Sequence, residues 1–235
     1  MSRICTICAR GGSKGVKNKN VKLILGKPLI AHSILQAKAS GLFDIIAVSS
    51  DSQEILLAAK EHGADIVIER PAELATDTAA KLPVIQHCVR EVEKQTRLSF
   101  DVMADIDATS PLRTVEDLKN SVELLENHEQ ATNLITGAPS RRSPYFNLVE
   151  QDANGFVHLS KELPAAIVRR QDAPKSFDMN ASIYVWKRDP FFKEIAIFTP
   201  NTIFYEMPEE RSIDIDSELD FEFVSFLAAK RGTLL

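Results

Sequence analysis

The stretch RICTICARGGSKG (residues 3–15) decides the fold class. Its first part, residues 3–8, is an apolar run that predicts a buried strand. Its second part, residues 9–15, is a glycine-rich loop with two cations. The run holds Cys5 and Cys8 in a C-x-x-C spacing, but no second Cys/His pair stands nearby to complete a zinc site. We therefore interpret both cysteines as packing residues of the strand.

From this stretch onward, strands and helices alternate along the chain. Short β-branched runs predict strands at 45–49, 65–69, 101–107 and 133–138, and helical spacing predicts helices at 29–39, 51–62, 81–96 and 115–127. Asp51 and Glu54 form a capping-box pattern at the second of these helices. This alternation is typical of the α/β class and predicts a three-layer, mostly parallel sheet. Ligands bind at the carboxyl ends of such strands, so the loops after Cys8, Ser49, Glu69 and Asp107 are expected to share one rim.

The alternation stops at Pro139. Residues 140–175 show no helical spacing, and the turn signal DANG (residues 152–155) separates two β-like pieces at 145–150 and 156–159. We interpret this part as an inserted, β-rich arm at about residues 140–175. Further strands at 181–186 and 202–207 and a helix at 218–230 complete one predicted domain over residues 1–235.

Charge and hydropathy exclude several classes of function. The net charge of −5 and the pI of about 5.6 argue against a nucleic-acid-binding protein. The first 43 residues, however, hold eight Lys or Arg and no acid, which predicts a small anionic ligand near the N-terminal loop. No apolar run approaches the roughly 20 residues that span a bilayer, and the N-terminus lacks a signal-peptide pattern. We expect a cytoplasmic protein without a membrane partner.

The glycine-rich loop is the first motif with chemical content. Its glycines allow backbone N–H groups to approach phosphates, and Arg10 and Lys14 add positive charge. It matches neither the Walker A pattern nor G-x-G-x-x-G. The alternative is a surface turn with solvated lysines.

The second motif is IDID (residues 213–216). Alternation places Asp214 and Asp216 on one face of an extended chain, and two carboxylates side by side suit Mg²⁺. The alternative is that Asp216 or Ser217 only caps the helix that begins near Glu218.

Two further motifs follow predicted strands. In DIDATSPLR (residues 105–113), a carboxylate at the end of a central strand suits a metal or substrate contact, while Thr109, Ser110 and Pro111 are also compatible with a purely structural loop. In RPAELATDT (residues 70–78), Arg70 is placed to contact a phosphate or nucleobase, and the alternative is a surface arginine.

Together these motifs resemble those of the acylneuraminate cytidylyltransferases, the CMP-sialic acid synthetases. ARGGSKG with Lys19-Asn20 is similar to the family's A-R-x-x-S-K-G…K-N loop, and residues 70–78 are similar to R-P-x-x-L-A-x-D-x-[TA]. TSPLR (residues 109–113) and SIDIDSELD (residues 212–220) match two further family motifs. The matches occur in order and span nearly the whole chain.

The resemblance implies a Rossmann-like nucleotidyltransferase domain over residues 1–235, with CTP as substrate and Mg²⁺, replaceable by Mn²⁺, as cofactor. It also implies a homodimer whose inserted arm reaches the partner's site. By motif position, the metal ligands would be Asp214 and Asp216. The nucleotide-binding residues would be Arg10, Gly11, Ser13, Lys14, Lys19, Asn20, Arg70 and Asp77.

Departures from the family pattern lie on the sugar side. The family often has Gln where this chain has Asp107, and a basic or polar residue where it has Asp178. Residues 7–20, 105–113 and 173–184 look more like those of the bacterial CMP-legionaminic acid synthetases, whose sugar is a dideoxy, diamino relative of sialic acid. We expect an acidic nine-carbon sugar of this type as partner. The predicted sugar-binding residues are Asp107, Arg141, Tyr145, Arg170, Gln171 and Asn180.

The implied reaction is attack by the anomeric hydroxyl of the sugar on the α-phosphorus of CTP, with release of pyrophosphate. Arg10 and Lys14 are predicted to stabilise phosphate charge, and Asp107 is a candidate for either the base or a metal ligand. Three alternatives stay open. They are a CMP-N-acetylneuraminic acid synthetase, a glycosyltransferase that uses Asp105 and Asp107 as a metal-binding D-x-D, and a non-catalytic nucleotide-binding regulator.

Overall fold

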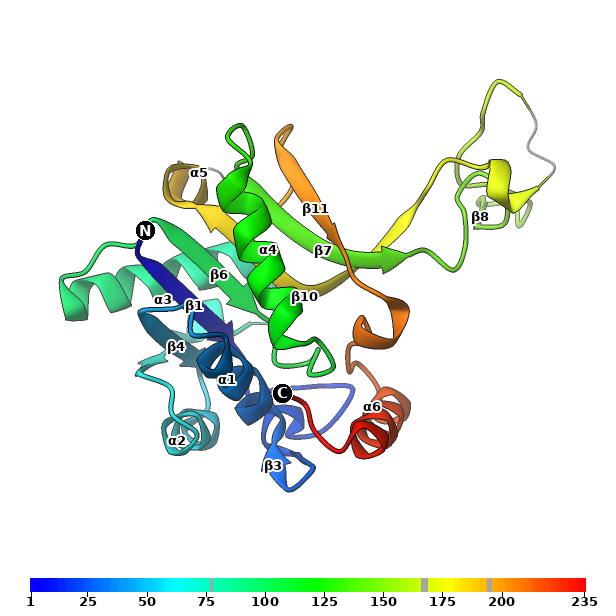
Figure 1. Cartoon of the computed structure of the whole chain (residues 1–235). Helices are drawn as coiled ribbons and strands as arrows, with labels where there is room; N and C mark the ends of the chain where they lie inside the picture. Colours follow the sequence, from blue (N-terminus) through cyan, green and yellow to red (C-terminus); the bar gives the residue numbers. More distant parts are fainter. Residues whose placement is uncertain (77, 166–168, 194–195) are drawn as a thin grey trace.

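A seven-stranded sheet forms the centre of the computed structural model, which describes residues 1–76, 78–165, 169–193 and 196–235. The strand order is β11-β7-β10-β6-β1-β4-β5 (Figure 1). Of these strands, β10 runs antiparallel to both of its neighbours, while the other neighbouring pairs are parallel. The bounds are β1 (Arg3–Cys8), β4 (Ile45–Ser50), β5 (Ile66–Glu69), β6 (Val102–Ile106), β7 (Asn133–Pro139), β10 (Phe177–Lys187) and β11 (Thr202–Glu206). The predicted mostly parallel sheet is confirmed.

Helices cover both faces of the sheet, which confirms the predicted three layers. Buried side chains of α1, α2 and α4 pack in one cluster with β1, and those of α3 and α5 pack in a second cluster with the other face. The helix bounds are α1 (Leu29–Ser40), α2 (Gln53–Glu61), α3 (Lys81–Thr96), α4 (Val115–Asn127), α5 (Arg188–Lys193) and α6 (Glu218–Arg231). The third and fourth helices begin and end at the residues that the spacing predicts.

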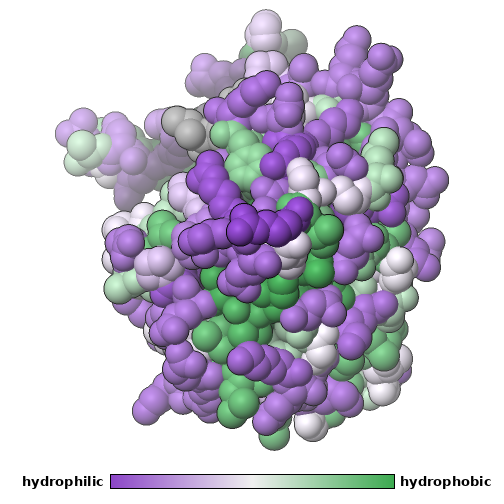
Figure 2. Space-filling view, turned by 90° about the vertical axis from the view of Figure 1, so that its left-hand side faces the viewer, coloured by the Kyte–Doolittle hydropathy of each residue, from purple (hydrophilic) through white to green (hydrophobic). Residues whose placement is uncertain are grey.

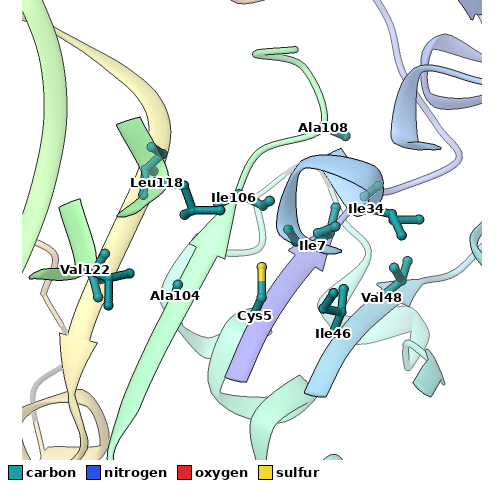
Figure 3. Close-up of a cluster of buried hydrophobic side chains, with 14 of the residues drawn as sticks. Cys5, Ile7, Ile34, Ile46, Val48, Ala104, Ile106, Ala108, Leu118 and Val122 are labelled. Atoms are coloured by element: carbon teal, nitrogen blue, oxygen red, sulfur yellow. The ribbon is translucent and has the colours of Figure 1, made fainter. Parts of the chain in front are cut away.

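The strand β1 shows why its sequence is apolar on both sides. Cys5 and Ile7 point to the face covered by α1 and α4, where Ile34 and Leu118 lie near them (Figure 3). Ile4 packs with α3 on the opposite face. A central strand of a parallel sheet is buried on both faces, so it carries a nearly continuous apolar run. Cys5 is fully buried and Cys8 half-buried in this strand.

The predicted capping box at α2 is wrong. The residue that caps this helix is Ser52, and its side chain makes no capping hydrogen bond. Asp51 instead accepts the backbone N–H of Gly11 at 2.9 Å. The carboxylate therefore holds the glycine-rich loop rather than the helix. Several short elements were not predicted from the sequence, among them the hairpin of β2 (Leu23–Ile24) and β3 (Lys27–Pro28) and the helix α5.

The inserted arm extends from paired ends of β7 and β10 and lies apart from the helices of the body, at the right of Figure 1. It contains the hairpin of β8 (Val149–Gln151) and β9 (Val157–Leu159), which is shorter than the predicted strands at 145–150 and 156–159. The turn between the two strands is confirmed, since Asp152 Oδ1 accepts the N–H groups of Asn154 and Phe156. The arm is thus less regular than the sequence predicts.

On the face that forms the left-hand side of Figure 1, hydrophilic side chains surround a patch of hydrophobic ones (Figure 2). Among the described residues, no helix combines the length and the apolar character that crossing a bilayer requires.

Candidate active site

The loops that follow four strands meet at one edge of the sheet, as predicted. The backbone N–H of Ala9, after β1, donates to the carbonyl oxygen of Ser49 in β4 at 3.0 Å. Arg70, after β5, donates from Nη2 to the same carbonyl oxygen at 2.8 Å. Arg70 is buried, so it joins two strand ends rather than standing on the surface. The shared rim is confirmed.

A cavity of about 230 Å³, the rim pocket, opens between the glycine-rich loop and the end of β6. It brings together predicted nucleotide-binding residues, one predicted metal ligand and the candidate base. Its lining is Cys8, Ala9, Arg10, Ser13, Lys14, Gly15, Lys19, Asn20, Asp107, Thr109 and Asp216. Gly11, Arg70 and Asp214 lie outside this lining, and Asp77 lies outside the described residues.

Backbone contacts hold the glycine-rich loop in place. Asn20 is buried and donates its amide to the carbonyl oxygen of Arg10 at 3.0 Å. Its Oδ1 atom is buried without a hydrogen-bond partner. A buried acceptor of this kind beside a pocket suits a donor on a ligand. A Cβ atom at Gly15 would lie 1.8 Å from the carbonyl oxygen of Asp216, so only glycine fits there.

The IDID segment lies against this loop and against the TSPLR turn. The N–H of Ile215 donates to the carbonyl oxygen of Thr109 at 3.0 Å. Lys19 donates to the carbonyl oxygen of Ile215, and its Nζ atom lies 3.6 Å from Asp216 Oδ1. The cap of α6 is Ser217, which forms a capping box with Asp220. The capping alternative is therefore confirmed for Ser217 and wrong for the Asp216 carboxylate.

The carboxylates of Asp214 and Asp216 suit a cation that is bound to phosphate at the same time. Burial and the nearby Asp216 carboxylate raise the pKa of Asp214, a repulsion that a cation would relieve. Among the described residues, no group of three or more His, Cys, Asp or Glu side chains is arranged to hold a metal. A magnesium ion here would need phosphate oxygens and water to complete its shell, which is its usual mode of binding.

At the end of β6, a lysine bridges the two aspartates of the DID motif. Lys81 Nζ lies 2.9 Å from Asp107 Oδ2 and 3.3 Å from Asp105 Oδ2. Asp105 is buried and also accepts the hydroxyl of Thr6 at 2.7 Å. Because the Lys81 ammonium group already lies between the two carboxylates, the pair does not fit the metal-binding D-x-D of a glycosyltransferase.

Burial and Lys81 act in opposite directions on the pKa of both carboxyl groups. Burial raises the pKa of Asp105. Burial also acts to raise the pKa of Asp107, but Lys81 and the N–H and hydroxyl of Thr109 outweigh it, so the pKa of Asp107 lies below its usual value. An ionised, well-paired carboxylate is a weak proton acceptor. The geometry thus favours Asp107 as a hydrogen-bond acceptor over Asp107 as a base.

Sequence reasoning missed Lys81. One signal was present, because Lys81 is the first residue of α3. The positive end of the helix dipole disfavours a cation at this position, so a lysine there needs a compensating partner.

The predicted sugar-binding residues of the arm lie in a second region. Arg141 pairs with Glu209 at 3.2 Å, and the ring of Tyr145 lies under Lys161. Gln171 lines a separate cavity of about 240 Å³ at the root of the arm. Of Arg170, only the backbone is described, in a short 3-10 helix. Within one chain, none of these residues lines the cavity between the glycine-rich loop and the end of β6.

Asn180 has an interior position. It is buried, its Oδ1 accepts the Thr136 hydroxyl at 2.6 Å, and its Nδ2 donates to Ser212 Oγ at 2.9 Å. Both ends of the amide therefore bind protein groups and link β7 and β10 to the segment before α6. Asp178, nearer the arm, is exposed and accepts the hydroxyl of Ser140 at 2.7 Å.

Comparison with known proteins was made on sequence and on structure. The family model described as Cytidylyltransferase matches residues 4–230. The chain is 47% identical over 229 residues to CMP-N,N'-diacetyllegionaminic acid synthase of Campylobacter jejuni, with 97% of this chain and 96% of that protein covered. It is 46% identical, at the same coverage, to post-translational flagellin modification protein B of Campylobacter coli.

More distant likenesses extend the same pattern. An N-acylneuraminate cytidylyltransferase of Streptococcus agalactiae is 32% identical over 230 residues, which cover 94% of this chain and 52% of that protein. The structure of CMP:2-keto-3-deoxy-manno-octonic acid synthetase complexed with CTP superposes with a TM-score of 0.71 at 16% identity, covering 98% of this chain and 100% of that one. This structural likeness shows the fold alone.

The family model matches almost the full length of the chain, and residues from both ends of the chain line the rim pocket. The protein is therefore a nucleotidyltransferase, and the chain belongs to the cytidylyltransferase family.

Proposed function

We propose that the protein transfers CMP from CTP to a nonulosonic acid of the N,N'-diacetyllegionaminic type and releases pyrophosphate. The observation that carries this proposal is the 47% identity to a CMP-N,N'-diacetyllegionaminic acid synthase over 97% of the chain. The cationic rim pocket, which contains Arg10, Lys14 and Lys19, supports it because a triphosphate needs charge neutralisation. We place the reaction in the cytoplasm, where CTP is supplied.

In the proposed reaction, the protein works by positioning and by charge stabilisation. The anomeric hydroxyl of the sugar attacks the α-phosphorus of CTP, and pyrophosphate is the leaving group. Arg10 and Lys14 line the rim pocket from the glycine-rich loop. Their positive charges stabilise the negative charge that develops on the phosphates. The buried Asn20 holds the loop in place by donating a hydrogen bond to the Arg10 carbonyl oxygen. When bound by Asp214 and Asp216, a magnesium ion would add charge neutralisation at the phosphates.

We further propose a homodimer in which the arm of one subunit completes the pocket of the other. The arm has little internal packing, and Phe156 and Val157 of its hairpin are 73% and 65% exposed. Apolar side chains on a segment without a core of its own are stabilised by packing on another surface. Because the cavity at the root of the arm shares no lining residue with the rim pocket of the same chain, a second subunit is the natural partner.

N-acetylneuraminate is the second candidate sugar, since an N-acylneuraminate cytidylyltransferase of Streptococcus agalactiae is 32% identical to this chain. We favour the diacetamido sugar because Asp107 and Asp178 replace the residues typical of the sialic acid enzymes. A carboxylate accepts hydrogen bonds from amide N–H groups, and a second acetamido group supplies one more such donor than N-acetylneuraminate has.

The test is a pyrophosphate-release assay with CTP, Mg²⁺ and purified sugars on one enzyme preparation. We expect kcat/KM for N,N'-diacetyllegionaminate to exceed that for N-acetylneuraminate by about tenfold or more, as for a site that pairs an extra polar group. ATP in place of CTP is the control. Equal or better use of N-acetylneuraminate would contradict the legionaminate proposal and leave the cytidylyltransferase assignment intact.

A further inference from the structure

The feature of interest is the position of Lys81 between two carboxylates. It begins α3, and its ammonium group also lies over the ring of Tyr184, 4.4 Å from the centroid. A cation at a helix N-terminus is disfavoured by the positive end of the helix dipole. Asp105, Asp107 and the aromatic face together offset this penalty and hold the ammonium group in one place.

The two carboxylates that Lys81 joins have different surroundings. The side chain of Asp105 is 1% exposed and bound to Thr6 on β1, so it is a fixed point of the core. The side chain of Asp107 is 24% exposed and lines the rim pocket. Lys81 therefore connects a fixed buried carboxylate to one that faces the ligand. A role limited to neutralising buried charge would not require one partner to open into the pocket.

The Asp107 carboxylate keeps capacity for one more donor. An ionised carboxylate has about four acceptor sites. Lys81 Nζ, the N–H of Thr109 and the hydroxyl of Thr109 account for three of them. A further donor can reach Asp107 from the pocket, which it lines. The triphosphate of CTP offers only negative charge, which the carboxylate repels, and the donors of CTP lie on its ribose and base. The sugar offers hydroxyl and amide donors.

We propose that Lys81 is a positioning residue for the sugar. It fixes the Asp107 carboxylate, which accepts a hydrogen bond from an N–H or O–H group of the nonulosonic acid. This inference rests on the proposed function and names which side of the pocket the sugar occupies. It also assigns the proton removal to a group other than Asp107, because the lysine and Thr109 already stabilise the ionised form of that carboxylate.

The test compares Lys81→Met, Lys81→Arg and Asp107→Asn with the wild type, using steady-state kinetics with each substrate varied in turn. We expect Lys81→Met to raise the KM for N,N'-diacetyllegionaminate by about tenfold or more, as for loss of a charged hydrogen bond. The KM for CTP should stay within about twofold. Lys81→Arg keeps the charge and should recover much of the loss. The control is Lys94→Met, an exposed lysine near the other end of α3.

A double-mutant cycle and a melting curve complete the test. If Lys81 acts through Asp107, the double variant of Lys81→Met and Asp107→Asn should be no worse for the sugar KM than Asp107→Asn alone. Lys81→Met leaves two carboxylates without a cation, so its Tm is measured as well. If it does not fold, Lys81→Gln, which removes the charge but keeps a hydrogen-bond donor, carries the test through the same split between the two KM values.

Three results would overturn the inference. They are an unchanged sugar KM in folded Lys81 variants, a rise in the CTP KM in place of the sugar KM, and a fall in kcat alone for Asp107→Asn, which would indicate a base. The wild type is assayed first. Absence of turnover with every nonulosonic acid tested would overturn the proposed function, and this inference with it, before any variant is compared.

Discussion

The rim pocket and the arm differ in how their side chains are held. At the rim, Arg70 and Asp107 are fixed by partners from separate strands and loops. In the arm, Arg141 pairs with Glu209 while 79% and 63% of the two side chains are exposed, and such pairs contribute little to stability. The rim is built to keep its geometry, whereas the arm has few contacts that fix it.

This difference matches the two tasks of the proposed reaction. Phosphoryl chemistry depends on charges placed in advance, and misplacement is costly in rate. Sugar recognition tolerates a surface that is ordered only on assembly. The comparison predicts that damage to the glycine-rich loop or the IDID segment affects kcat strongly, while damage to the arm affects use of the sugar and depends on the partner subunit.

Metal removal is expected to have the largest effect. If Asp214 and Asp216 bind Mg²⁺ together with phosphate, excess EDTA should abolish pyrophosphate release, and Mg²⁺ or Mn²⁺ should restore it. Asp216→Asn should lower kcat by about 10²-fold or raise the Mg²⁺ requirement. The matched control is Glu218→Gln, an exposed carboxylate nearby that pairs with Lys22. Full turnover in EDTA would show that no metal is needed.

The next effect is expected at Gly15. A methyl group there meets the Asp216 carbonyl oxygen, so Gly15→Ala must move the glycine-rich loop away from the IDID segment. A shift of about 1 Å in catalytic groups lowers the rate by about 10²-fold. Gly12→Ala is the control in the same loop, because its Cβ would have no atom within 4 Å. Similar kcat values for the two variants would show that the contact at Gly15 does not position the site.

The sequence predicted the body of the molecule well because its signals are local. Apolar spacing placed α3 and α4 at their observed bounds, and strand ends predicted the shared rim. Pairings between distant residues leave no such signal. Lys81 meets Asp107 only after β6 and α3 pack, and Asp51 turns from α2 to Gly11 only once β1 and β4 are neighbours.

The arm was predicted as an insertion but not in its form. Its strands are only three residues long. Little of the arm packs on the body, so few contacts extend the pairing. The amide of Asn180 likewise carried no sequence signal for burial. Its partners, Thr136 and Ser212, come from segments far away in the chain.

A smaller effect is expected when two damaged proteins are mixed. Lys14→Ala removes a rim charge, and the double variant Arg141→Glu with Arg142→Glu reverses charge in the arm. If arm and rim meet across a dimer, each hybrid dimer has one intact site. Mixing equal amounts after dissociation should then restore about a quarter of wild-type turnover. The control mixes Lys14→Ala with itself. No recovery, despite hybrid dimers seen by native mass spectrometry, would place both elements in one chain.

The smallest effect is expected for Arg141→Ala. Its ion pair with Glu209 is exposed, so unfolding free energy should change by no more than about 0.5 kcal/mol. If Arg141 contacts the sugar carboxylate, kcat/KM for the sugar should fall by about 3- to 30-fold. Lys60→Ala, an exposed lysine of α2, is the control. A marked loss of Tm with unchanged kinetics would assign Arg141 a structural role only.

The paired ends of β7 and β10 have a consequence for how such proteins diversify. Pro139 lies opposite Phe177 and Ala138 opposite Asp178, so the chain leaves the body and returns to it at one place. Lengthening or shortening the segment between them alters neither the register of the sheet nor the rim pocket, and each doubling of its length adds only about 0.6 kcal/mol of closure entropy. Insertions, deletions and exchange of this segment can therefore change the arm, while the sheet and the rim pocket are inherited unchanged.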